Sequence, residues 1–355
     1  MEPHAHIGAV AGDFAQRRRA LEEQTLSPLA ARSWPAVRRA AEADCGLRSP
    51  LQRDRDRIVH SKAFRRLKHK TQVFVAPEGD HYRTRLTHTI EVTQIARTVA
   101  RGLRLNEDLV EAIGLGHDLG HPPFGHIGEA ILDACVHERY GEGGFRHYEH
   151  SLRVVDVLEP SPSAIGRDAG LGLNLTDDVR DGILCHSGRA PMPRTLEGRI
   201  VRIVDRVAYV NHDIDDALRA GVITARDLPA GPIAVLGESG SQRIDALVHD
   251  LVESSESAGD IAQGDDAGPA MDELRTFMFD NVYLGPQART EHGRIERVIR
   301  TLFEHYASDS ARIPDGGGAA GADEAQRVVD YVAGMTDRFC IRVFEELTVP
   351  ESFAA

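Results

Sequence analysis

Apolar residues recur at helical spacing through the long ordered stretches of this 355-residue chain. Between residues 86 and 103 they lie mostly on one helical face, and the same spacing runs through 109–119, 195–218 and 323–347. A proline pair at 122–123 ends the second of these stretches. Alternating strand patterns are scarce, and aromatic residues make up only 5% of the sequence. We therefore predict an all-α fold.

Composition changes along the chain predict its organisation. Residues 1–50 are rich in arginine at the start and carry no core periodicity, so we expect an N-terminal arm. Residues 51–350 hold the periodic stretches and are predicted to form one large domain. Within it, the small and acidic segment 253–270 is expected to be a flexible excursion, and the glycine-rich segment 314–322 a loop.

The overall charge restricts the class of partner. A formal net charge of -13 argues against a broad nucleic-acid surface, but a cluster of basic residues between Arg53 and Arg85 could hold a small anion. No run of eighteen apolar residues occurs, and the first residues lack the layout of a signal peptide. The four cysteines form no Cys-x-x-Cys pair. We expect no membrane span, no disulfide framework, and a cytoplasmic location.

Histidine is concentrated in one part of the chain. Of 17 histidines, seven lie between residues 60 and 126, and residues 116–126 read Gly-His-Asp-Leu-Gly-His-Pro-Pro-Phe-Gly-His. The adjacent His117 and Asp118 offer an imidazole nitrogen and a carboxylate oxygen, which are suitable donors for a divalent cation. This pair predicts a metal site.

Three further residues of this segment suggest proton transfer. His121 follows His117 by four residues, so the two are expected to share a helix face. The glycines and prolines then turn the chain and present His126, and Glu129 lies three residues further on. A carboxylate one turn from an imidazole can orient it and tune its pKa.

A lone His-Asp pair is a weak signal, because a polar helix end can produce it by chance. Two more residues strengthen the metal interpretation here. His88 lies on an upstream helical stretch, and Asp205 lies within a downstream apolar stripe. A carboxylate in such a stripe is costly unless it binds a cation. The alternative for Asp205 is a salt bridge to Arg202 or Arg206, and we favour the metal.

Several ordered blocks resemble the deoxyguanosine triphosphate triphosphohydrolases and their bacterial relatives in the HD superfamily. More distantly, they resemble the animal dNTP triphosphohydrolase that carries a SAM domain. The resemblance covers roughly residues 50–350. The matching blocks are 52–58, 64–67, 70–73, 83–88, 116–129, 145–147, 205–213 and 330–337.

The resemblance implies a fold and an activity. The fold would be an HD-domain helical bundle with additional helices. The activity would be metal-dependent cleavage of a deoxynucleoside triphosphate into a deoxynucleoside and triphosphate. One divalent ion is implied, Mg²⁺ or Mn²⁺ in the first place, with iron, cobalt and nickel as alternatives. Relatives often form symmetric hexamers, which implies a homo-oligomer. Single-stranded DNA binding occurs among relatives, but the acidic balance gives it no support here.

The resemblance also assigns roles to individual residues. The ligands of one divalent ion would be His88, His117, Asp118 and Asp205. The proton-transfer group beside the α-phosphate would be His126 with Glu129, assisted by His121. Residues near the phosphates would be Arg85, Arg206 and His147. Residues that meet the deoxyribose and exclude a 2′-hydroxyl would be Gln72, Tyr209 and Asp213.

Each of several candidate substrate residues also has a purely structural interpretation. Arg85 could be a surface charge, His147 could be exposed to solvent, and Tyr209 with Asp213 could merely pack or pair. The residue His150 departs from the relatives, which often carry an amide at this place.

Two alternative functions stay open. Another HD-type nucleotide phosphohydrolase would share the metal ligands but lack the Lys-Thr-Gln-Val and Tyr-x-x-x-Asp groups, which are present. A non-catalytic nucleotide sensor on the same scaffold would have lost His126 or a metal ligand, and none is lost.

Overall fold

The regular structure of the chain is helical. A computed structural model describes residues 11–72, 83–141, 143–160, 171–283, 285–314, 317–319 and 321–350. Throughout these ranges there is no β-strand, and the only extended pairings are isolated bridges from Arg38 to Thr176 and from Thr71 to Thr84. The predicted all-α fold is confirmed. None of the helices in these ranges is long and apolar enough to cross a bilayer.

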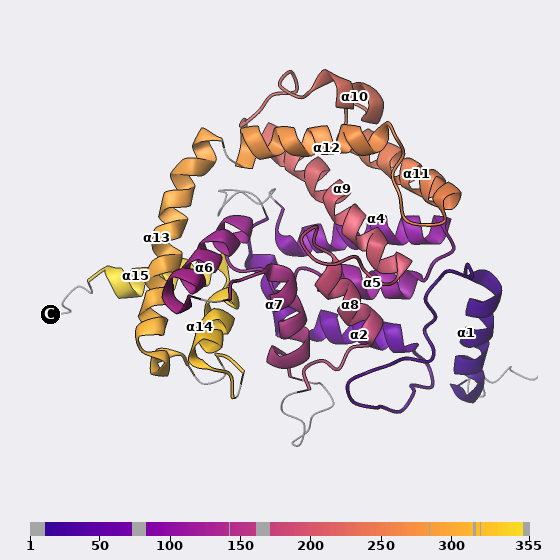
Figure 1. Cartoon of the computed structure of the whole chain (residues 1–355), viewed down its shortest axis with the longest axis horizontal. Helices are drawn as coiled ribbons and strands as arrows, with labels where there is room; N and C mark the ends of the chain where they lie inside the picture. Colours follow the sequence, from indigo (N-terminus) through magenta and orange to yellow (C-terminus); the bar gives the residue numbers. More distant parts are fainter. Residues whose placement is uncertain are drawn as a thin grey trace, which may run out of the picture.

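Helices of different lengths follow one another along the chain, and the mostly irregular residues 26–49 connect the first two of them (Figure 1). The α-helices of the described ranges are α1 (Ala11–Thr25), α2 (Pro50–His60), α3 (Lys62–Arg66), α4 (Arg85–Gly102), α5 (Glu107–Gly116), α6 (Gly125–Tyr140), α7 (His147–Arg153), α8 (Asp177–Cys185), α9 (Leu196–Arg219), α10 (Ala230–Leu236), α11 (Gly240–Ala258), α12 (Ala267–Met278), α13 (Pro286–Ser308), α14 (Glu324–Ala333) and α15 (Asp337–Thr348). Short 3₁₀ turns lie at Leu67–His69 and Ser310–Arg312, and π-helical turns lie at Val154–Leu158 and Phe279–Tyr283.

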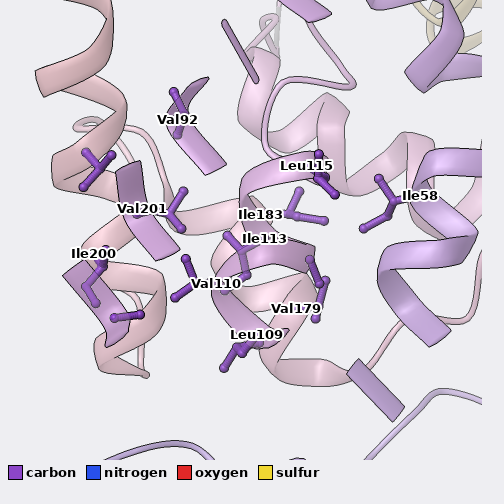
Figure 2. Close-up of a cluster of buried hydrophobic side chains, with 14 of the residues drawn as sticks. Ile58, Val92, Leu109, Val110, Ile113, Leu115, Val179, Ile183, Ile200 and Val201 are labelled. Carbon is purple, nitrogen blue, oxygen red and sulfur yellow. The ribbon is translucent and has the colours of Figure 1, made fainter. Parts of the chain in front are cut away.

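The central core lies between α2, α4, α5, α8 and α9. Figure 2 shows its apolar side chains converging from these helices, and Val92, Ile113 and Ile183 are fully buried there. Each such side chain contributes about 1.5–3 kcal/mol by leaving water. The close approach of α8 to α5 requires Gly182, because a Cβ atom there would lie 2.3 Å from Cδ1 of Ile113.

Two further cores flank the central one. The inner faces of α6, α13, α14 and α15 enclose Leu132, Phe303 and Val328, and these helices form the left flank in Figure 1. The second half of α9 packs with α10, α11 and α12 around Leu247 and Met271. The long helix α9 thus belongs both to the central core and to the core that it forms with α10, α11 and α12.

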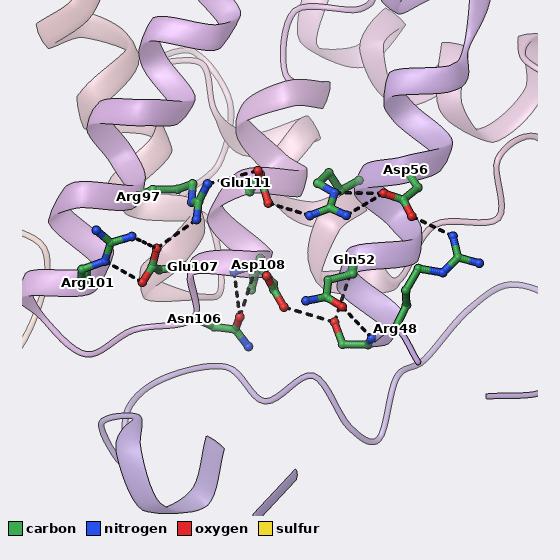
Figure 3. Close-up of polar contacts among 12 residues, drawn as sticks. Arg48, Gln52, Asp56, Arg97, Arg101, Asn106, Glu107, Asp108 and Glu111 are labelled. Carbon is green, nitrogen blue, oxygen red and sulfur yellow. Dashed lines mark hydrogen bonds and ion pairs between the residues drawn. The ribbon is translucent and has the colours of Figure 1, made fainter. Parts of the chain in front are cut away.

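Polar contacts fix the start of α5 against its neighbours (Figure 3). The side chain of Asn106 caps the helix by accepting hydrogen bonds from the backbone N–H groups of residues 108 and 109, at 3.1 and 3.3 Å. Glu107 accepts from Arg101 of α4 at 2.7 Å, and Arg97 of α4 donates to both Glu107 and Glu111 at 3.3 Å. These contacts set the rotation of α5, which determines where its C-terminal end points.

That C-terminal end differs from the sequence expectation. The apolar pattern predicted helix to residue 119, but α5 ends at Gly116, so His117 and His121 do not share a helix face. Side-chain bonds replace the helical ones after this point. Ser151 donates from Oγ to the carbonyl of His117 at 2.7 Å and accepts from the N–H of Gly120 at 2.9 Å.

Two other stretches also differ from expectation. The helix predicted over 323–347 is interrupted between α14 and α15, because Thr336 caps a new helix by accepting from the N–H of Phe339 at 3.3 Å. The segment 253–270, expected to be a flexible excursion, is helical at both ends, and only residues 259–266 connect α11 to α12. Gly259, with a φ of 68°, ends α11 there.

Candidate metal centre and active site

Histidine and aspartate side chains from three helices meet beside the central core. His88 lies in the first turn of α4, His117 caps the end of α5, and Asp205 lies in the middle of α9. The Oδ1 atom of Asp205 is 3.0 Å from Nε2 of His88 and 3.7 Å from Nε2 of His117. These three ligand atoms all lie within 4.8 Å of one another, so one ion could contact all of them.

His117 is oriented for this role by its own helix. Its Nδ1–H donates to the carbonyl of Gly114 at 2.7 Å, which leaves the buried Nε2 atom without a hydrogen-bond partner in the described structure. An orphaned buried nitrogen is costly unless it binds a ligand. Together with a second imidazole and a carboxylate, this set fits a divalent cation.

Asp118 lies beside this group, between His117 and His121. Its Oδ1 atom is 3.6 Å from Nε2 of His117 and 3.5 Å from Nε2 of His121, while its Oδ2 atom accepts from Nη1 of Arg85 at 2.8 Å. Burial opposes its charge, but His117 and Arg85 hold the pKa of the Asp118 carboxyl well below its usual range. The carboxylate is therefore available as an anionic ligand.

A second group contains the residues expected to transfer protons. Glu129 on α6 links two histidines, because one carboxylate oxygen is 3.2 Å from Nδ1 of His126 and the other is 2.9 Å from Nδ1 of His147. The ring of His121 stacks on that of His147, with centroids 4.1 Å apart. The His126 side chain is 72% exposed, whereas His147 is buried. The alternative that His147 is exposed to solvent is therefore wrong. His126 faces outward from the cluster.

The two arginines expected at the phosphates differ in their surroundings. Arg85 is only 1% exposed and is paired with Asp118, but its Nε and Nη2 atoms have no hydrogen-bond partner in the described structure. Arg206 is half-buried, and within the described ranges no carboxylate forms an ion pair with it. Arg202 instead donates to main-chain carbonyls, including that of Cys185 at 2.9 Å. The alternative pairing of Asp205 with Arg202 or Arg206 is therefore wrong.

Several arginines of the predicted basic cluster between Arg53 and Arg85 are paired with carboxylates. Arg53 and Arg57 both contact Glu42, and Arg83 pairs with Glu91 and Asp216. These arginines hold the arm and the helices together and do not form an open anion site.

Two of the three residues expected to meet a sugar, Tyr209 and Asp213, lie one turn apart on α9. The hydroxyl of Tyr209 accepts from Nε of Arg275 at 2.9 Å, and the buried carboxyl of Asp213 makes a short contact with the hydroxyl of Tyr283. Burial raises the pKa of Asp213 to about 8. Tyr209 and Asp213 therefore both pair with other side chains, as the purely structural interpretation suggested. The Oδ1 atom of Asp213 has no hydrogen-bond partner in the described structure. The Oε1 atom of Gln72 is likewise buried without one.

Sequence reasoning missed three residues of this region. His186, at the end of α8, lies with its Nε2 atom 3.2 Å from Nε2 of His147. Tyr283 and Arg275 reach the polar side of α9 from the turn after α12 and from α12 itself. Neither a repeat nor a short motif marks them, and only the position of His186 at the end of an amphipathic stretch could have drawn attention to it.

Residues near the C-terminal end of the chain hold the site loops in place. The carboxylate of Asp337 accepts from the backbone N–H groups of Thr71, at 2.8 Å, and Phe124, at 3.0 Å. Lys70 is fully buried and donates to the carbonyls of His121 and Ala333. Since Phe124 directly precedes α6, these contacts set the position from which His126 extends.

Comparisons with known proteins agree with this geometry. Residues 85–210 match the HD domain family, and residues 261–346 match the family described as phosphohydrolase-associated domain. The first match begins at the start of α4 and ends within α9, so it spans the metal-ligand candidates. All four cysteines of the chain are free.

Curated relatives cover nearly the whole chain. A deoxyguanosinetriphosphate triphosphohydrolase-like protein from Caldanaerobacter subterraneus is 49% identical over 335 residues, which is 93% of this chain and 94% of the relative. Proteins of the same description from Clostridium perfringens and Desulfatibacillum aliphaticivorans are 46% and 45% identical and cover 86% and 95% of this chain, or 88% and 97% of their own lengths. The chain therefore belongs to the deoxyguanosinetriphosphate triphosphohydrolase-like family of HD-domain phosphohydrolases.

Proposed function

We propose that this chain is a metal-dependent dNTP triphosphohydrolase, which cleaves a deoxynucleoside triphosphate into a deoxynucleoside and intact triphosphate. The observation that carries the proposal is the meeting of the metal-ligand candidates with an outward-facing histidine that is paired to a buried carboxylate. The names of the relatives support the substrate class.

The residues that would hold the cation are His88, His117, Asp118 and Asp205. When bound, a divalent ion neutralises phosphate charge and polarises the phosphoryl group. Arg206, which has no carboxylate partner in the described ranges, and the unpaired nitrogens of Arg85 would hold phosphate oxygens.

His126 would supply the proton that the leaving group needs. Attack at the α-phosphorus expels the 5′-oxygen of the nucleoside, and this oxygen must be protonated as it leaves. The Nδ1–H of His126 donates to Glu129 at 3.2 Å, so Nε2 is the atom presented outward. The ring of His121 packs beside that of His126, with ring centroids 5.0 Å apart. The group is thus oriented and accessible, as a general acid must be.

The products distinguish this reaction from other nucleotide hydrolyses. We expect at least one dNTP, incubated with Mg²⁺ or Mn²⁺, to yield a deoxynucleoside and intact triphosphate. Anion-exchange separation of the products checks the expectation. Nucleoside monophosphate with pyrophosphate would indicate a different phosphohydrolase, and no turnover of any nucleotide would favour a sensor.

We expect deoxynucleotides to be preferred over ribonucleotides. Tyr209 and Asp213 lie one turn apart on the helix that carries Asp205, and their contacts with Arg275 and Tyr283 fix them in place. A rigid wall beside a 2′-carbon leaves little room for a hydroxyl, and such discrimination is on the order of 10²-fold. The ratio of kcat/KM for dGTP to that for GTP, and the same ratio for the nucleotides of each other base, measures this preference.

A variant locates the source of this preference. Tyr209→Ala opens the wall, so the deoxy-to-ribo ratio should fall toward one. The control is Tyr140→Ala, which removes a tyrosine at the far end of α6. An unchanged ratio in the Tyr209 variant would assign the discrimination to other residues.

A further inference from the structure

His186 is built in the same way as His117. Each residue caps the end of its helix in a helical conformation, is fully or almost fully buried, and donates its Nδ1–H to the carbonyl three residues earlier at 2.7 Å. For His117, this bond turns Nε2 toward Asp205 and Asp118. For His186, the same bond turns Nε2 toward His147. A histidine whose second nitrogen is held by a carbonyl or a carboxylate is the usual form of a metal ligand.

His147 meets the same description. Its Nδ1–H donates to the Glu129 carboxylate at 2.9 Å, and that oxygen also accepts the backbone N–H of His147 at 3.1 Å. The ring is further fixed by stacking on His121. Its Nε2 atom is therefore presented in a defined direction, toward His186.

The two Nε2 atoms face each other at 3.2 Å. Because each ring already donates through Nδ1, each neutral ring offers a lone pair at Nε2, and two lone pairs repel unless a proton or a cation lies between or beside them. Two nitrogens that bind one ion at about 2.0–2.1 Å lie roughly 2.9–3.4 Å apart at bond angles near 90–110°. The observed separation falls within that range.

A carboxylate completes the group. One oxygen of Asp118 and the ring nitrogens of His147 and His186 all lie within 4.8 Å of one another, and all three residues are buried. We propose that Asp118, His147 and His186 form a second divalent-cation site, which shares Asp118 with the site of His88, His117 and Asp205. This deepens the proposed function, on which it rests, because the second ion would lie beside the group that meets the phosphates.

Metal stoichiometry tests the second site without any nucleotide. The full chain, stripped with a chelator and dialysed, is titrated with Mn²⁺ while the electron paramagnetic resonance signal of free Mn²⁺ is followed. We expect the wild-type chain to bind two ions, and a shared carboxylate should couple their spins and broaden the bound signal. His186→Ala should bind one ion, with an uncoupled signal.

Two comparisons separate ligand loss from general damage. His150→Ala removes another buried histidine, whose Nδ1 contacts the carbonyl of Gly120, and this variant should still bind two ions. Added imidazole, which fits the space left in His186→Ala, should restore the second ion, and a purely structural role for His186 would not produce this rescue.

Saturation of the wild-type chain at one ion overturns the inference, and so does binding of two ions by His186→Ala. A proton shared between the two rings would then explain their contact. If His186→Ala does not fold, the wild-type count and the coupling of its spins decide the matter alone. The titration contains no substrate, so its result does not depend on the proposed function. If the chain binds two ions but releases no triphosphate from any dNTP in a separate assay, the proposed function is contradicted and the second site still stands.

Discussion

Asp205→Ala is expected to remove the ion that His88 and His117 would hold with it, and to remove the activity as a consequence. The Asp205 carboxylate contacts His88 at 3.0 Å and lies 3.7 Å from the ring nitrogen of His117, so it is the anionic member of that ligand group. Loss of a group that only supports a ligand costs about 10–100-fold in affinity, and loss of the ligand itself should cost at least the upper figure. Metal analysis of the purified variant, with turnover at saturating dNTP, measures both effects.

A neighbouring carboxylate on the same helix provides the control. Asp215 lies ten residues along α9, where it contacts Arg243 at 3.5 Å, away from the histidines. Asp215→Ala should retain metal and turnover. If Asp205→Ala keeps a full complement of metal, Asp205 serves only to orient His88, and the ligand set proposed above is wrong.

The long amphipathic helices could be predicted from the sequence almost to the residue. The stretches 86–103 and 195–218 correspond to α4 and α9, because in both cases a threonine cap precedes an apolar stripe that is buried over most of its length, with Ile90 of α4 as an exposed exception. Here the local pattern and the tertiary packing require the same structure.

Helix ends were predicted less well where tertiary contacts set them. The apolar spacing runs on past Gly116, but the bonds of Ser151 to His117 and Gly120 end α5 there. The spacing likewise runs across the break before α15, where Asp337 is needed to hold Thr71 and Phe124. In both places the decisive partner lies far away in the sequence, so a local pattern could not reveal it.

The site follows the same division. His117 and Asp118 are adjacent in the sequence, and the cost of a carboxylate in an apolar stripe points to Asp205 as a further candidate ligand beside His88. His186 escaped notice because its only local signature is the bond from its ring to the carbonyl of Ile183. The role proposed for His186 depends on its contact with His147, which is distant in the sequence and lies beside it only in the folded chain.

His126→Ala should fail in a different way from Asp205→Ala. The His126 side chain is 72% exposed and points outward from the buried ligand atoms, while Glu129 holds its Nδ1 atom. A group in this position can reach a leaving oxygen without being needed to retain a cation. Its loss should leave metal content near that of the wild-type chain and lower kcat by about 10²–10⁴-fold, the usual contribution of general acid–base catalysis.

His137→Ala is the matched control for that variant. This histidine lies on the same helix, α6, three turns further along, and it is exposed. Its removal should change neither metal content nor kcat. If His126→Ala loses its metal as completely as Asp205→Ala, His126 is a ligand and the division of roles fails. If it keeps both metal and full turnover, the proton comes from another residue. His121 is then the next candidate, because its ring lies 5.0 Å from that of His126 and its Nδ1 atom is buried without a hydrogen-bond partner in the described structure.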